Sequence, residues 1–159
     1  MSCKSSKASK NKKNEPSITI IKAPKYDSIN TKDLASDIID YAKQFEGVKY
    51  KFGGTTKAGM DCSGLVYRSY KAYNIHLPRV SRDMAKQGEK IYIDDVKVGD
   101  LLFFKTNDKR NTINHVGLVV TALPGNIEFI HSTTSLGVII SSLAEHYWYY
   151  AFVEARRIL

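Results

Sequence analysis

The chain has 159 residues, which is room for one catalytic-sized domain and too little for a multidomain machine. Apolar residues make up 43% and charged residues 25% of the chain, so it can bury a core and does not have the composition of a disordered protein. No run of about 18 apolar residues occurs, so we expect neither a membrane span nor the apolar core of a signal peptide.

The formal net charge of +8 raises nucleic acid or an anionic surface as a possible partner, but the charge is concentrated at the N-terminus. Residues 1–14 hold five lysines and no acidic residue, so the other 145 residues carry 19 basic and 16 acidic residues, a net charge of +3. No aromatic residues lie between these lysines, as single-strand binding would need, and we predict no nucleic-acid partner. We interpret residues 1–28 as a flexible tether and 29–159 as one domain.

The first half of the domain is predicted to be helical. Apolar residues at helical spacing predict a helix over 31–46, with Thr31 as its cap, and a second helix over 62–74. Residues 81–88 mark a short third helix. Five segments rich in β-branched and aromatic residues follow, at 100–104, 115–121, 127–132, 138–142 and 151–158. Helices followed by strands, without βαβ alternation, predict an α+β fold in which N-terminal helices pack on an antiparallel sheet.

Cys62 is a candidate nucleophile, because it lies where a glycine-rich turn becomes a helix. A thiol in the first helical turn experiences the partial positive charge of unpaired backbone N–H groups, which favours the thiolate. The alternative is a small buried apolar side chain. The other cysteine, Cys3, lies in the polar tail, so we expect no intramolecular disulfide.

A cysteine nucleophile in amide hydrolysis needs a base, and usually a third group that holds the base. His115 begins a predicted strand and shares a face with the small Gly117, which would leave space above the sheet. His131 lies in the next strand, and a hairpin would bring the two imidazoles side by side. We assign His76 and His146 to surface or structural roles.

A zinc site is the alternative use of the same residues. Cys62, His115 and His131 could be three ligands, with Asp61 as a fourth. Their spacing is not that of a closed structural site, so we expect no metal and no other cofactor. Metal analysis, and a comparison of a chelator with a thiol alkylator, would distinguish the two readings.

Several motifs follow one another along the domain: YKFGGTTKAGMDCSGL at 50–65, LPR at 77–79, VGDLLFF at 98–104, HVG at 115–117 and FIHS at 129–132. In this order they resemble the NlpC/P60 cysteine peptidases. The resemblance extends over about 35–159, and the closing segment from 137 onward is similar to the lipoprotein murein endopeptidases of that family. It implies a small papain-like α+β fold and hydrolysis of peptide bonds in bacterial peptidoglycan stems.

The resemblance also implies roles for single residues. It makes Cys62 the nucleophile, His115 the general base and His131 the polar third member that orients the base. It places Tyr50 where its hydroxyl would help to stabilise the oxyanion of the tetrahedral intermediate, and the alternative is a tyrosine packed under the turn.

Four further residues match positions that line the substrate cleft in relatives: Asp61, Ser63, Arg79 and Ser81. Their charges and hydroxyls suit a zwitterionic stem peptide. The alternatives are a helix cap for Asp61 and a surface ion pair for Arg79.

The expected bond is the D-alanyl-diaminopimelate cross-link, and the γ-D-glutamyl-diaminopimelate bond within a stem is second. A catalytically silent peptidoglycan-binding module and an acyltransferase on the same fold remain open as alternatives. Similarity to lipoproteins implies that Cys3 is the lipidated residue, and the alternative is a spare thiol in the tail. We therefore expect a monomer at the periplasmic face of a bacterial cell envelope, an outer-membrane lipoprotein that contacts the membrane only through its lipid.

Overall fold

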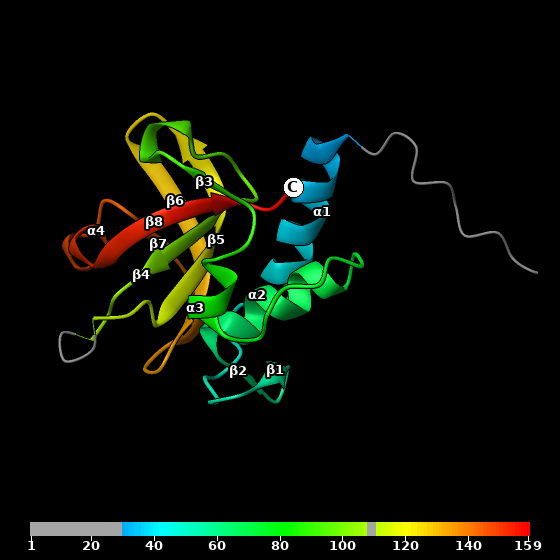
Figure 1. The fold of residues 1–159 in the computed structure, drawn as a ribbon. Coiled ribbons are helices and arrows are strands. Elements are labelled where there is room, and N and C mark those ends of the chain that lie inside the picture. The colour runs from blue at the N-terminus through cyan, green and yellow to red at the C-terminus, as the bar shows by residue number, and fades with distance from the viewer. Residues whose placement is uncertain (1–29, 108–110) are drawn as a thin grey trace, which may run out of the picture.

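The computed structural model describes residues 30–107 and 111–159. The predicted tether, with Cys3, lies outside the described residues. Figure 1 shows two main layers, in which the helices α1 (Thr31–Lys43), α2 (Cys62–Lys71) and α3 (Ser81–Met84) lie against a sheet and the C-terminal end returns beside α1. This is the α+β arrangement predicted from the order of helices and strands. Within the described part of the chain, no helix combines the length and apolar character that crossing a bilayer needs.

The helices begin close to where the sequence predicts and end earlier. α1 is capped by Asn30 rather than Thr31, because the Asn30 side chain accepts a hydrogen bond from the Lys32 N–H at 3.3 Å. After Lys43 the backbone N–H groups bond to carbonyls three residues back, which tightens the chain into turns before residue 46. α2 and α3 likewise end three and four residues before the predicted positions.

The sheet has six antiparallel strands in the order β3-β8-β4-β5-β6-β7. The C-terminal strand therefore lies between β3 and β4. Five of the six strands were predicted from β-branched and aromatic segments, and β3 was not. The strands are β3 (Glu89–Ile91), β4 (Leu101–Phe104), β5 (His115–Leu123), β6 (Asn126–Thr133), β7 (Gly137–Ser142) and β8 (Phe152–Arg157).

Both faces of the sheet bury apolar side chains, so the strands alternate between two cores. Val116, Leu118 and Ile130 face α1 and α2 in the larger core. Val119 and Phe129 point to the opposite face, into a smaller core that also contains Trp148. At ~25 cal/mol per Å² of apolar surface removed from water, these two cores supply the main stabilising free energy of the domain.

Besides β3, four short elements were not predicted. They are the hairpin strands β1 (Thr55–Thr56) and β2 (Gly59–Met60), the 3-10 turn η1 (Ile93–Asp95) and the helix α4 (His146–Ala151). The sequence of α4, HYWYYA, is aromatic enough to read as the start of a strand, but burial of Trp148 and Ala151 in the smaller core holds it as a helix.

Candidate active site

Cys62 is the first residue of α2 and is 9% exposed. Burial raises the pKa of its thiol, and backbone N–H groups of Val116, Ser63 and Cys62 itself act in the opposite direction by stabilising the thiolate. The backbone N–H groups at the helix start thus lower the pKa of the thiol as the sequence predicts, but desolvation raises it by more. The resting thiol is therefore protonated at neutral pH and needs a base beside it.

The two predicted histidines lie side by side. His115 begins β5 and His131 lies in β6, and His115 Nε2 is 2.9 Å from His131 Nδ1 in a hydrogen bond. Burial lowers the pKa of His115 to about 4 and, together with the neighbouring His115, lowers the pKa of His131 to about 3. Both imidazoles are therefore neutral at neutral pH, which is the form that can accept a proton.

Ser141 and Trp148 complete the surroundings of this pair, and neither was predicted as a site residue. His131 Nε2 lies 3.0 Å from Ser141 Oγ on β7. The Trp148 ring stacks on His115, with centroids 5.2 Å apart and planes at 24°, and meets His131 edge-on at 4.6 Å. These contacts depend on strand register and on α4. Ser141 could have been predicted only by pairing β6 with β7 in the correct register.

The space expected above Gly117 is filled. A Cβ at this position would lie 2.3 Å from Cδ2 of Phe129, whose ring lies 4.6 Å from that of His131. Gly117 is therefore needed for the packing that supports the histidine pair rather than for an opening above the sheet.

Cys62 and His115 line one cleft of about 480 Å³. Tyr50 and Trp148 line it as well. Burial, followed by the nearby Cys62 and Asp61, raises the pKa of Tyr50, so its phenol stays protonated and can donate a hydrogen bond.

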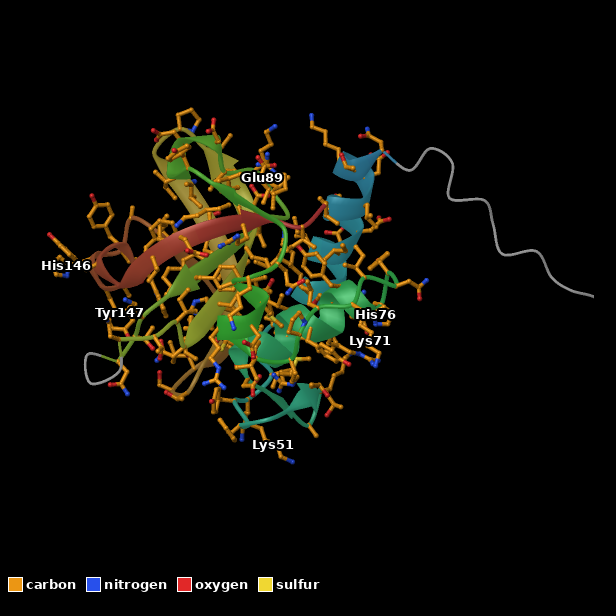
Figure 2. All side chains as sticks on the ribbon, viewed as in Figure 1. Lys51, Lys71, His76, Glu89, His146 and Tyr147 are labelled. Atoms are coloured by element: carbon orange, nitrogen blue, oxygen red, sulfur yellow. The ribbon has the colours of Figure 1, made fainter. Side chains whose placement is uncertain are left out.

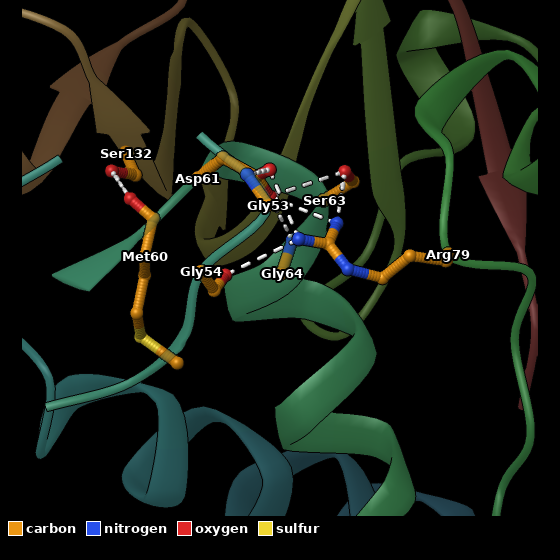
Figure 3. Close-up of polar contacts among 8 residues, drawn as sticks. All are labelled: Gly53, Gly54, Met60, Asp61, Ser63, Gly64, Arg79 and Ser132. Carbon is orange, nitrogen blue, oxygen red and sulfur yellow. Dashed lines mark hydrogen bonds and ion pairs between the residues drawn. The ribbon is translucent and has the colours of Figure 1, made fainter. Parts of the chain in front are cut away.

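Asp61 acts as the cap of α2 and also holds the preceding turn. Its Oδ1 accepts a hydrogen bond from the Gly64 N–H and its Oδ2 accepts one from the Gly53 N–H, both at 2.7 Å (Figure 3). Ser132 Oγ donates to the Met60 carbonyl at 2.8 Å and ties the same turn to β6. The carboxylate that precedes Cys62 thus helps to hold Cys62 in position.

Arg79 joins Asp61 and Ser63 in one charged network. Its guanidinium lies 2.9 Å from the Asp61 carboxylate and donates to Ser63 Oγ at 2.8 Å and to the Gly54 carbonyl at 3.3 Å (Figure 3). Both alternatives from the sequence, a cap and an ion pair, are therefore present. Ser81 is buried at the start of α3. The residues that line the 480 Å³ cleft in the described chain do not include these four.

The other histidines are exposed, and Figure 2 places them at opposite edges of the molecule, His76 near α2 and His146 on α4. Within residues 30–107 and 111–159, no three His, Cys, Asp or Glu side chains are grouped as a metal site would require. The facing nitrogens of His115 and His131 are committed to each other at 2.9 Å.

A cysteine at a helix start, opposite a histidine pair on an antiparallel sheet, defines the papain-like class of α+β folds. Residues 47–157 match the family model described as the NlpC/P60 family, which is more than half of the chain. The chain belongs to the NlpC/P60 family.

Relatives with described functions are similar over most of this chain. Murein DD-endopeptidase MepS/Murein LD-carboxypeptidase of Escherichia coli K12 is 39% identical over 128 residues, covering 80% of this chain and 64% of that protein. Gamma-D-glutamyl-L-lysine dipeptidyl-peptidase of Bacillus subtilis 168 is 40% identical over 115 residues, covering 72% of this chain and 38% of that protein. The chain thus matches less than two thirds of the length of each.

A solved structure supports the fold. The crystal structure of an NlpC/P60 family protein from Bacillus cereus superimposes with a TM-score of 0.70 at 31% identity, covering 79% of this chain and 40% of that chain. The predicted papain-like NlpC/P60 fold is confirmed by this likeness and by the antiparallel sheet.

Proposed function

We propose that this protein is a cysteine peptidase of the bacterial cell wall that hydrolyses peptide bonds of peptidoglycan. The observation that carries the proposal is a buried thiol, Cys62, that lines the same cleft as His115, whose Nε2 is bonded to His131. The functions of the relatives, a murein endopeptidase among them, support the choice of substrate.

In the proposed reaction, Nδ1 of His115 accepts the proton of the Cys62 thiol, because Nε2 is already bonded to His131. The sulfur attacks the amide carbonyl carbon, and the Tyr50 hydroxyl and the Cys62 N–H donate to the oxyanion. His115 then gives its proton to the leaving amine, the C–N bond breaks, and a thioester remains. Water, deprotonated by His115, attacks the thioester, and the thiol is restored as the carboxylic acid leaves.

The bond that we favour is the D-alanyl-diaminopimelate cross-link, because a murein DD-endopeptidase is 39% identical to this chain. The γ-D-glutamyl-diaminopimelate bond is second. It is supported by the Bacillus subtilis relative, which is a gamma-D-glutamyl-L-lysine dipeptidyl-peptidase. Mass spectrometry of sacculi digested by the purified protein distinguishes the two by product mass. Release of no product by the wild-type protein would favour a silent binding module, and new amide or ester products would favour an acyltransferase.

Arg79 is proposed to contact the stem peptide beside the cleft, and the buried Ser63 is proposed to hold its guanidinium in place. The Arg79 side chain is 32% exposed, whereas that of Asp61 is 11% exposed and has its oxygens bonded to Gly53, Gly64 and Arg79. Of these residues, Arg79 is therefore the one that can reach a substrate carboxylate, and Asp61 holds its guanidinium in place. For Ser81, which is buried, we propose only a supporting role at the edge of the same region.

We further propose that the protein works as a monomer at the periplasmic face of the cell envelope and that Cys3 carries a lipid in the outer membrane. Similarity to a murein endopeptidase supports an envelope location. Mass spectrometry of native protein extracted from membranes tests the anchor, and an unmodified Cys3 or recovery in the cytosolic fraction would contradict it.

A further inference from the structure

We infer that Ser141 is a positioning residue for the histidine pair: its hydroxyl accepts a hydrogen bond from His131 Nε2 and so stabilises the state in which His115 holds the thiol proton. The inference deepens the proposed function and rests on it for the role of His115. It assigns a fourth residue to the line Cys62, His115 and His131.

The position of Ser141 is fixed by the sheet. In the β6–β7 ladder, His131 lies opposite Ile139 and Phe129 lies opposite Ser141, so Ser141 is the diagonal neighbour of His131 on the same face. His131 is fully buried and Ser141 is 6% exposed, with 3.0 Å between Nε2 and Oγ. A hydrogen bond in such a dry site is strong, and its loss leaves a buried polar atom without a partner.

The direction of the hydrogen bonds follows from the chemistry. Once His115 has taken the thiol proton, both of its nitrogens carry hydrogen, so Nε2–H must donate to His131 Nδ1. His131 then carries its own proton on Nε2 and must donate to Ser141 Oγ. In this charged state, the His131 Nε2–H has a hydrogen-bond acceptor only if the Ser141 hydroxyl is present.

Without the hydroxyl, the charged state loses an acceptor in a buried, charge-assisted chain. The neutral pair can instead adopt the opposite tautomers, with the His131 proton on Nδ1 and the His115 proton on Nδ1, where it blocks the base. In that arrangement the Ser141 hydroxyl would donate to His131 Nε2, so loss of Ser141 removes one neutral hydrogen bond from either neutral arrangement. From the charged state it removes a charge-assisted hydrogen bond, which is stronger, so proton transfer to His115 becomes less favourable.

The test compares Ser141→Thr with Ser141→Val, since these side chains have nearly the same shape and differ in the hydroxyl. The rate of Cys62 alkylation by iodoacetamide, measured across pH, reports proton transfer to His115 without any peptide substrate. We expect Ser141→Val to slow alkylation at neutral pH, and kcat with it, about 10- to 100-fold, with KM changed little and with Ser141→Thr close to wild type. Ser142→Ala on the same strand is the matched control.

Equal alkylation rates for the Thr and Val variants, both with an unchanged pH profile, would overturn the inference. Because alkylation needs no peptidoglycan, this outcome is separate from failure of the proposed function, which would appear as absence of cleavage products from wild-type protein.

A second inference comes from the charge of the cleft. Among the described residues that line it, Glu145 is the one carboxylate, and neither lysine nor arginine joins it. Glu145 is exposed and precedes α4, but its side chain does not cap that helix. Instead, one carboxylate oxygen accepts the Ser142 N–H at 2.8 Å. Glu145 lies one helical turn before Trp148, whose ring stacks on His115.

We propose that Glu145 binds a primary ammonium group of the substrate, such as that of a diamino acid in a stem peptide. This also rests on the proposed function. The probe is a stem peptide with its side-chain amine free or acetylated, and its binding is measured by calorimetry to Cys62→Ala protein, which cannot turn it over. We expect Glu145→Gln in that background to weaken binding of the free amine about fivefold and to leave the acetylated peptide unchanged.

Glu89→Gln, at the distant end of the sheet, is the control for a general charge effect (Figure 2). An equal change for both peptides, or no change for the free amine, would overturn the assignment of Glu145. Since binding is measured without turnover, absence of hydrolysis by the wild-type protein would be a separate result, against the proposed function.

Discussion

Two polar clusters flank Cys62, and they differ in charge and in burial. On the sheet side, His115, His131 and Ser141 form a buried, neutral line of hydrogen bonds. On the helix side, Asp61 and Arg79 form a charged, partly exposed network. The two clusters therefore have different tasks: the charged one fixes the position of Cys62, and in the proposed mechanism the neutral one receives the proton of the Cys62 thiol.

The physical reason lies in the cost of burying charge. Two backbone N–H groups and a guanidinium compensate for the burial of the Asp61 carboxylate. For the two imidazoles, burial is the largest cause of the lowered pKa values and holds them neutral. A neutral imidazole can accept a proton.

The largest effect is expected from removing the reacting groups. Cys62→Ala and His115→Ala should each lower kcat/KM on muropeptides by about 10³-fold or more, because each removes a chemical step rather than a contact. Thermal unfolding should stay close to wild type. His146→Ala, an exposed histidine on α4, is the control. Full activity in Cys62→Ala would refute the mechanism.

Removing the centre of the charged cluster should affect stability most. Asp61→Ala leaves the Gly53 and Gly64 N–H groups and Arg79 without their acceptor, and should lower the free energy of unfolding by about 3 kcal/mol. Urea denaturation measures this change. Asp83→Ala, which removes an exposed carboxylate, should leave it close to the wild-type value. Equal effects of the two substitutions would mean that Asp61 does not support the turn.

The neutral cluster should make stability depend on pH in a defined window. Histidine titrates near 6.5 when unfolded, and burial lowers the pKa to about 4 for His115 and about 3 for His131. Below pH 6.5 the unfolded chain binds protons that the folded chain does not, so the free energy of unfolding falls as the pH drops to about 4. The loss should be on the order of 3 kcal/mol for one imidazole.

Urea titrations at a series of pH values measure this loss, and His131→Asn should reduce it by removing one buried titrating group. His76→Gln, at an exposed position, should leave the pH dependence as in wild type. If His131→Asn and wild type lose stability in parallel between pH 6.5 and 4, the histidine pair is not its source.

The smallest effect is expected at the exposed edge of the charged cluster. Arg79→Lys keeps the charge but cannot contact Asp61, Ser63 and the Gly54 carbonyl together, and should cost about 1 kcal/mol in urea unfolding. Its partial exposure limits the effect. A loss as large as that of Asp61→Ala would show that the ion pair, rather than the helix cap, carries the stability of the cluster.

Much of the fold could be predicted, because periodicity reports how a segment is buried. The helices near 31 and 62 and five strands follow from that signal. β3 and the β1–β2 hairpin were missed because two or three residues carry too little of it. α4 was missed because its aromatic sequence favours a strand, and only packing of Trp148 against the sheet makes it helical.

The site divides in the same way. Cys62, His115 and His131 could be placed near one another from the sequence, because a helix start and two strands joined by a short turn are signals that the sequence carries locally. Ser141 could not, since a shift of one residue in the β6–β7 pairing would turn it to the other face. The charged network depends on Arg79, which is 18 residues from Asp61 and lies in a segment without periodicity.

The place of β8 in the sheet has a consequence for how the molecule assembles. β5 and β6 are joined by a short turn and can pair early, which brings the histidines together from local sequence. β3 and β4 are neighbours in sequence but are separated in the sheet by β8. The edge of β4 that faces away from β5 therefore has no partner until residues 152–157 pair with it. The histidine half of the site thus depends on a pairing that is local in sequence, while completion of the sheet depends on the pairing of β8, which is distant in sequence from both of its neighbours.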